Sequence, residues 1–172
     1  MDSCSLVEMH VVTVRPYLSE NQPLVWLKEK TGQESRLLPI AIGEFEAASI
    51  QMCLQGDKPI RPIAYDLLVS ILQSNTANVL QIVIHTVRQS IFYAKIVVEY
   101  NHVIQDIDAR PSDAIALALR FNSPIFTYDK ILDKAGIILK KEVSEKKSEK
   151  KFDESLKGLS IKDLNKKISE AI

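Results

Sequence analysis

Apolar and polar residues alternate along Leu6–Val14 in the pattern expected of a β-strand. Two short apolar segments, Leu24–Glu29 and Leu37–Ile42, predict a second and a third strand. Because the links between these three are short, they predict an antiparallel meander. Two β-branched runs, Val79–Val87 and Ile91–Tyr100, predict a long hairpin. Further strands are expected at Val103–Asp108 and Ile125–Tyr128.

Four other segments show the spacing of helices. Apolar residues recur every three to four positions in Glu44–Gln55 and, most regularly, in Ala64–Gln73. Pro111–Arg120 is apolar nearly all round, which predicts a helix buried in the middle of the fold, and Asp129–Ala135 predicts a short helix. The pattern as a whole predicts an α+β fold, with a mixed, mainly antiparallel sheet and three to four packed helices.

The composition changes after residue 139. From Lys140 to Lys151 the sequence is dominated by Lys, Glu and Ser and is poor in apolar groups, so residues 140–158 predict a flexible charged linker. Residues 159–172 predict a short amphipathic helix, which is marginal alone in water, so we expect it to need a protein partner. The sequence therefore divides into a domain at 1–139, a linker and a terminal helix.

The overall charge is balanced, with 22 basic and 22 acidic residues. Residues 1–139 carry 12 Lys/Arg and 15 Asp/Glu, whereas residues 140–172 carry 10 and 7. This is unlike the strongly basic surface of a general nucleic-acid binder, so a nucleic acid would have to be met by a local patch or with the help of a cation.

Cysteine usage and hydropathy indicate the compartment. Cys4 and Cys53 are the two cysteines of the chain, too few for a disulfide framework, which indicates a reducing environment. No apolar run approaches the about 20 residues that span a bilayer, and the N-terminus lacks the pattern of a signal peptide. We therefore expect a cytoplasmic protein that does not enter a membrane.

Charged side chains gather around the start of the buried helix. Asp108 ends the preceding strand, Arg110 follows, and Asp113 falls in the first helical turn. Pro111 suits the first position of a helix, and a carboxylate in the first turn faces unpaired N–H groups. Because the strand end adjoins this turn, the carboxylates of Asp108 and Asp113 could converge.

The same residues permit a structural interpretation. Asp113 suits the role of a dipole partner for its own helix, and Asp108 with Arg110 would fix the strand-to-helix corner. The isolated histidines lack the spacing of metal ligands, and Tyr65 is expected to be a packing residue. Other acids allow the same explanation: Glu46 in a first helical turn, and Asp66 paired with Arg61.

Three blocks of sequence form a recognisable set. They are Leu38–Gly43 with Glu46, then Arg61-Pro62 with Asp66-Leu67-Leu68, and then Ile107–Arg120 followed by Pro124-Ile125-Phe126 and Ala135-Gly136-Ile137. In this order they resemble the bifunctional nuclease family, long catalogued as a domain of unknown function. The resemblance covers about residues 6–139. It implies a compact α+β domain, nuclease activity on DNA and RNA, and a homodimer or higher homo-oligomer.

The resemblance suggests functional residues only at the charged positions that match the family. These positions are Glu46, Arg61, Asp66, Asp108, Arg110, Asp113 and Arg120. Most relatives have a Thr-His pair before the aspartate of the second block, where this chain has Ala64-Tyr65, so a histidine general base is absent there. The tail at 159–172 is similar to the opening helix of the UVR motif of excision-repair proteins, and the chain stops before the second half of that motif.

Hydrolysis of a phosphodiester requires an activated water and a stabilised negative charge. With no histidine at the matching position, carboxylates that hold Mg²⁺ or Mn²⁺ would serve, with arginines gripping the phosphate. The catalytic candidates are Asp108, Asp113, Glu46 and Asp66, of which Asp108 and Asp113 are candidate metal ligands; the phosphate-binding candidates are Arg110, Arg61 and Arg120. The leading hypothesis is a metal-assisted nuclease. The alternative is a non-enzymatic interaction or regulatory module whose Asp/Arg cluster is structural.

Overall fold

The computed structural model describes residues 5–16, 22–31 and 35–139, which form eight strands and four helices. The strands are β1 (Leu6–Pro16), β2 (Pro23–Glu29), β3 (Ser35–Ala41), β4 (Asn78–Arg88), β5 (Ile91–Tyr100), β6 (Val103–Ala109), β7 (Ile125–Tyr128) and β8 (Ile137–Leu139). The helices are α1 (Glu44–Gln55), α2 (Ala64–Ser74), α3 (Pro111–Phe121) and α4 (Asp129–Ala135). Every strand and helix predicted within the described residues is confirmed, and β8 is an addition. The α+β prediction is therefore correct.

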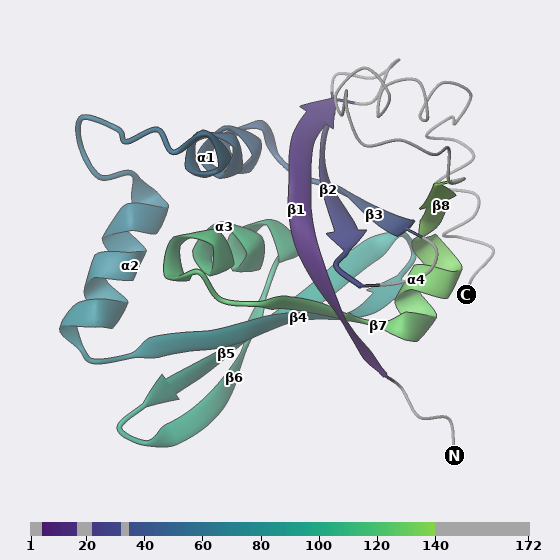
Figure 1. Ribbon diagram of the computed structural model, residues 1–172. Helices are drawn as coiled ribbons and strands as arrows, with labels where there is room; N and C mark the ends of the chain where they lie inside the picture. The colour runs from purple at the N-terminus through teal and green to yellow at the C-terminus, as the bar shows by residue number, and fades with distance from the viewer. Residues whose placement is uncertain (1–4, 17–21, 32–34, 140–172) are drawn as a thin grey trace.

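One mixed sheet runs through the molecule in the order β6-β5-β4-β7-β1-β2-β3-β8 (Figure 1). Two antiparallel groups, β1-β2-β3 and β4-β5-β6, are each built from consecutive strands. The short β7 lies between them, antiparallel to β1 and parallel to β4. Its Ile125 is opposite Met9 on one side and Ile82 on the other, so a single strand joins the two groups into one sheet.

The core lies between this sheet and the helices. All five residues of α3 from Ala114 to Ala118 are at most 3% exposed, which confirms the predicted buried helix. α3 packs on β4 and β5, and α1 packs on α3 through a face that includes buried Ala47 and Ile50. In Figure 1 α1, α2 and α3 gather on one side of β1, and α4 lies on the other. The first turns of three helices are thereby brought close together.

Helix α2 is the least buried of the four. Its main packing partner is α3, and none of its residues is fully buried. Tyr65, Val69 and Leu72 pack partly against the core, whereas Leu68 and Ile71 stay exposed. The periodicity of this segment predicted the helix correctly, but Leu67, Leu68 and Ile71 are exposed to solvent.

The predicted charged linker at 140–158 and the terminal helix at 159–172, with its similarity to the UVR motif, lie outside the described residues. Within the described part of the chain, no helix is both long and apolar enough to cross a membrane.

Candidate functional site

Three acids occupy equivalent places in three helices. Glu46, Asp66 and Asp113 are each the third residue of their helix, where a carboxylate faces the positive end of the helix dipole. Asp66 also accepts a hydrogen bond from the backbone N–H of Ile63 at 3.1 Å, which closes the first turn of α2. Each of the three carboxylates is in addition bound by an arginine. Helix starts, rather than loops, therefore position the candidate acids.

Arg110 joins two of these acids at the surface. Its Nε lies 2.7 Å from Asp113 Oδ2, and its Nη2 donates to Asp113 Oδ1 at 3.0 Å and to Glu46 Oε1 at 2.7 Å. The guanidinium side chain is 66% exposed, whereas those of Glu46 and Asp113 are 17% and 29% exposed. An accessible arginine thus covers two partly buried carboxylates from α1 and α3. We call Glu46, Tyr65, Arg110 and Asp113 the Arg110 cluster.

Tyr65 completes this cluster from α2. Its hydroxyl donates a hydrogen bond to Asp113 Oδ1 at 2.5 Å. The sequence predicted a packing role alone for Tyr65, because an aromatic residue on an amphipathic helix is usually a core residue. The one signal for a polar role was its position, where the resemblance described above leads us to expect a histidine.

The cluster shifts the protonation of its members. Burial alone raises the pKa of Asp113, but hydrogen bonds from Arg110 and Tyr65 outweigh burial and leave the pKa below its ordinary value. Burial, and then the hydrogen bond to Asp113, raise the pKa of Tyr65. At neutral pH Asp113 is therefore a carboxylate and Tyr65 a neutral phenol. Tyr65 can donate a proton or a hydrogen bond but cannot act as the base.

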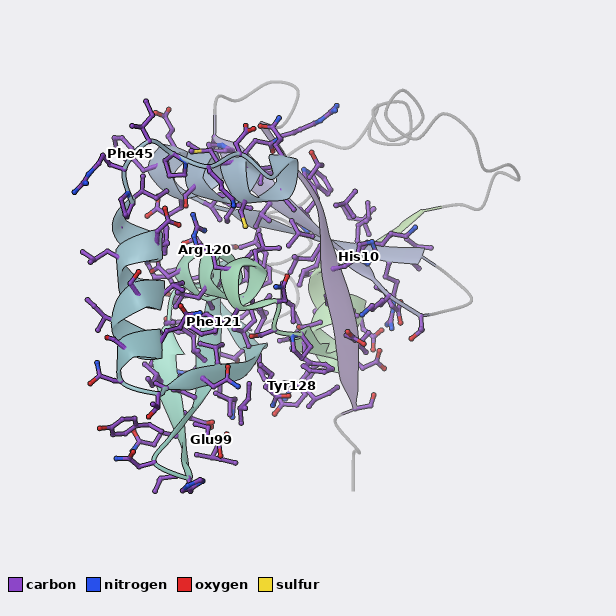
Figure 2. All side chains as sticks on the ribbon, turned by 60° about the vertical axis from the view of Figure 1, so that its left-hand side comes forward. His10, Phe45, Glu99, Arg120, Phe121 and Tyr128 are labelled. Carbon is purple, nitrogen blue, oxygen red and sulfur yellow. The ribbon has the colours of Figure 1, made fainter. Side chains whose placement is uncertain are left out.

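Arg120 and Asp66 form a second, deeper pair. Arg120 Nε lies 2.7 Å from Asp66 Oδ1, and the arginine side chain is only 10% exposed. Arg120 also donates to Ser49 Oγ at 3.0 Å and to the carbonyl of Ala116 at 3.1 Å, and its guanidinium lies 5.4 Å from the Tyr65 ring centroid. Figure 2 shows Arg120 on α3, between α1 and α2. With these bonds already made, Arg120 is placed to hold three helices together.

Two of the predicted site residues, Asp108 and Arg61, lie apart from these pairs. Asp108 is opposite Lys95 on β5, and the residues on either side of Lys95, Ala94 and Ile96, belong to the core beneath α3. Because side chains alternate along a strand, Asp108 faces away from α3. The convergence of Asp108 with Asp113 that the sequence suggested is therefore wrong. The carboxylate of Asp108 lies on the face of β6 that points away from α3.

Arg61 is the other predicted residue that stands apart. It is exposed in the segment that precedes α2. The alternative explanation of Asp66, a pair with Arg61, does not hold, because Asp66 is paired with Arg120 of α3. Of the seven candidates, the structure groups Glu46, Arg110 and Asp113 in one cluster and Asp66 with Arg120 in an adjoining pair, both in contact with Tyr65.

The donor set for a metal ion is limited in the described part of the chain. No three His, Cys, Asp or Glu side chains there lie close enough to one another to hold a metal. Glu46 and Asp113 are held together as a pair of carboxylates, since one guanidinium nitrogen of Arg110 bonds both. Carboxylate oxygens are the ligand type that Mg²⁺ and Mn²⁺ prefer.

Comparison with known proteins finds a match to one protein family. The model of a family described as the bifunctional nuclease domain matches residues 25–140, which is more than half of the chain. Two similar proteins come from Mycobacterium tuberculosis, one from strain CDC 1551 / Oshkosh and one from strain ATCC 25618 / H37Rv. Each is 35% identical over 138 residues, which cover 80% of this chain and 81% of the relative, and each is described as uncharacterized.

Proposed function

Because this chain belongs to the bifunctional nuclease domain family, we propose that it hydrolyses phosphodiester bonds of DNA or RNA at the Arg110 cluster. The single observation that carries the proposal is the position of Arg110. Its guanidinium is exposed and lies directly over two carboxylates, one of which is also held by a phenol. An anion binder and a water-orienting group are thereby side by side at the surface.

Arg110 would bind the substrate phosphate. A planar guanidinium presents paired N–H donors that match two phosphate oxygens. Its carboxylate partners compete for the same donors, so a phosphate would have to displace part of the contact with Glu46 or Asp113. The side chain can turn outward because two thirds of its surface is already in solvent.

Asp113 would orient the attacking water. It stays ionised at neutral pH, and its bond from Tyr65 fixes the carboxylate when Arg110 turns to the phosphate. A carboxylate with a lowered pKa is a weak base, so its contribution is chiefly to position the water. Tyr65, which remains protonated, is a hydrogen-bond donor for a developing negative charge.

A divalent metal is part of the proposal. Mg²⁺ is usually bound by one or two carboxylates together with waters and substrate phosphate oxygens, and Glu46 and Asp113 could supply the two carboxylates. They would hold the ion, which would supply positive charge to the phosphate and lower the pKa of water. Asp108, a ligand candidate from the sequence, faces the other side of the sheet and is left out of this set.

The test is cleavage of labelled single-stranded DNA, double-stranded DNA and RNA by the full chain with Mg²⁺, Mn²⁺ or a chelator. We expect Asp113→Asn and Glu46→Gln to lower kcat about 100-fold. Asp133→Asn, an exposed acid on α4, is the matched control and should leave kcat unchanged. Equal cleavage by folded Asp113→Asn and Glu46→Gln would remove the proposal. Equal cleavage with chelator present would remove only its metal.

A second candidate function is a non-enzymatic interaction or regulatory module. It is favoured by one observation: every one of the three helix-start acids already forms an ion pair with an arginine. In that case Asp113→Asn lowers the unfolding free energy by about 2 kcal/mol, as loss of a charged hydrogen-bonded partner does, and no cleavage is seen. If Asp113 is catalytic, the unaltered chain cleaves nucleic acid and the same variant loses that cleavage, whatever its effect on the unfolding free energy.

A further inference from the structure

Phe45, in the first turn of α1, exposes its aromatic ring to solvent. It is 89% exposed, whereas Phe92, Phe121 and Phe126, the other phenylalanines that the structure describes, are buried or half-buried. Figure 2 shows Phe45 at the outer margin of the molecule, where α1 approaches the first turn of α2. Because almost none of its surface is removed from water, the ring contributes little to the stability of the fold. It is available for contact with a ligand.

Phe45 is joined to the Arg110 cluster through the backbone of α1. Glu46 follows Phe45 directly, and its carboxylate accepts a 2.7 Å bond from Arg110. Because consecutive Cα atoms lie about 3.8 Å apart, one glutamate side chain spans most of the gap between the backbone at Phe45 and the guanidinium of Arg110. The phosphate and the base of a nucleotide are separated by a similar span. A strand whose phosphate binds Arg110 therefore brings a base within reach of the ring.

Further basic side chains lie in the segment that leads into α2. Arg61 is exposed two residues before Ile63, the N-cap of α2, and Lys58 is exposed earlier in the same segment. Since Tyr65 in the first turn of α2 belongs to the Arg110 cluster, this segment ends beside the cluster. Single-stranded nucleic-acid sites combine cations that follow the phosphates with aromatic rings on which bases stack. Both kinds of group are present on this surface.

We propose that Phe45 stacks on a base of the bound strand and makes the Arg110 cluster select single-stranded over double-stranded nucleic acid. This inference rests on the proposed function, because it takes Arg110 as the group that binds the phosphate. In a duplex the faces of each base are covered by its neighbours, and a base reaches the ring only if it is unpaired and unstacked. Because every base has a π-face, the ring selects the strand state of the substrate and not its sequence.

Fluorescence anisotropy of the full chain tests the proposal with labelled phosphorothioate DNA of about 12 nucleotides. Phosphorothioate linkages slow hydrolysis, so binding is measured apart from cleavage, with Mg²⁺ present. The probes are a single strand, a duplex of the same sequence, and a strand with abasic sites in place of its bases. We expect the single strand to bind more tightly than the duplex. Phe45→Ala should weaken binding of the single strand about 10-fold and leave binding of the duplex and the abasic strand unchanged.

Two further variants separate stacking from simple apolar contact. Phe45→Trp should bind the single strand at least as tightly as the unaltered chain, whereas Phe45→Leu, which keeps apolar bulk without a π-face, should lose nearly as much as Phe45→Ala. Tyr100→Ala removes another exposed aromatic ring and is the control that should bind normally. Tyr100 lies at the opposite end of the β5–β6 pairing from Ala109, which precedes Arg110. Thermal unfolding should show that all four variants are folded.

Several results would overturn the stacking site: no binding of the single strand, equal affinity for single strand and duplex, single-strand binding that Phe45→Ala leaves unchanged, an equal loss on the abasic strand, or normal binding by Phe45→Leu. Cleavage of unmodified strands separates this outcome from that of the proposed function. A chain that cleaves nucleic acid without any dependence on Phe45 loses the stacking site alone. A chain that needs Phe45 for single-strand binding but cleaves nothing keeps the stacking site and loses the nuclease proposal.

Discussion

Tyr65 of α2 donates a 2.5 Å hydrogen bond to Asp113 of α3, across 48 positions of sequence. The bond ties the first turn of α2 to the first turn of α3, and Arg110 then ties Asp113 to Glu46 of α1. Three helix starts therefore depend on one another through a single carboxylate. The charge state of Asp113 is the quantity on which both the stability and the proposed chemistry of the cluster depend.

Tyr65→Phe removes the donor and keeps the ring beneath Arg120. Loss of the bond should raise the pKa of Asp113, because the carboxylate loses one of the two donors that stabilise its charge. The unfolding free energy should fall by about 1 kcal/mol. NMR titration of the carboxyl carbon and urea unfolding measure the two effects. Tyr93→Phe, at an exposed tyrosine of β5, is the control, and an unshifted Asp113 titration would contradict the prediction.

Stability should depend on pH through Asp66. The hydrogen bond from Arg120 is the main cause that lowers the pKa of Asp66 in the folded protein. A carboxyl with a lowered folded pKa stabilises the fold above the unfolded value of about 4, and this stability is lost as pH falls through the folded value. Asp66→Asn should therefore cost about 2 kcal/mol at pH 7 and much less at acid pH. Equal costs at both pH values would contradict this.

Arg36 links α4 to the sheet through ion pairs. It donates two bonds to Glu29, at 2.9 and 3.0 Å, and lies 2.8 Å from Asp129 and 3.1 Å from Asp133 of α4. Arg36→Met leaves Glu29, which is 8% exposed, without this partner, and should cost about 3 kcal/mol in urea unfolding. Lys30→Met, which breaks only the exposed pair with Glu8, should cost little. Equal losses from both variants would show that burial of Glu29 is not the cause.

Gly136 follows α4 where no side chain fits. A Cβ at this position would lie 2.3 Å from the carbonyl oxygen of Leu132, so the backbone would have to shift. Gly136→Ala should cost about 2 kcal/mol, as overpacking does. Gly56→Ala is the comparison: its Cβ would meet no atom within 4 Å, and its cost of about 1 kcal/mol arises only from a φ of +73°. A larger loss of thermal stability in Gly56→Ala than in Gly136→Ala would contradict the packing argument.

The local elements of this fold were predictable because each carries its own periodicity. The apolar surface of Pro111–Arg120 predicted a buried helix, and Ala114 to Ala118 are buried. The place of β7 was not predictable in the same way. Nothing in Ile125–Tyr128 indicates that it pairs with both Met9 and Ile82, because these contacts join segments far apart in the sequence.

The candidate site was predicted in part. Charge and position identified Glu46, Arg110 and Asp113, since acids in first helical turns and an arginine at a helix start are visible in the sequence. The separation of Asp108 depends on which face of β6 is covered by α3, and this follows from packing rather than from residue type. The role of Tyr65 depends on how α2 crosses α3, which local sequence does not encode.

The position of β7 also sets an order on folding during synthesis. β1 pairs through Leu6–Met9 with Ile125–Tyr128 of β7. One edge of β1, the first strand to be synthesised, therefore has no hydrogen-bonding partner until β7 has been made. On the ribosome the two hairpin groups can form early, but the sheet closes only after most of the chain has emerged. A nascent chain that stalls before residue 125 would therefore expose the inner edges of β1 and β4 together, and at that stage we expect the greatest need for chaperones.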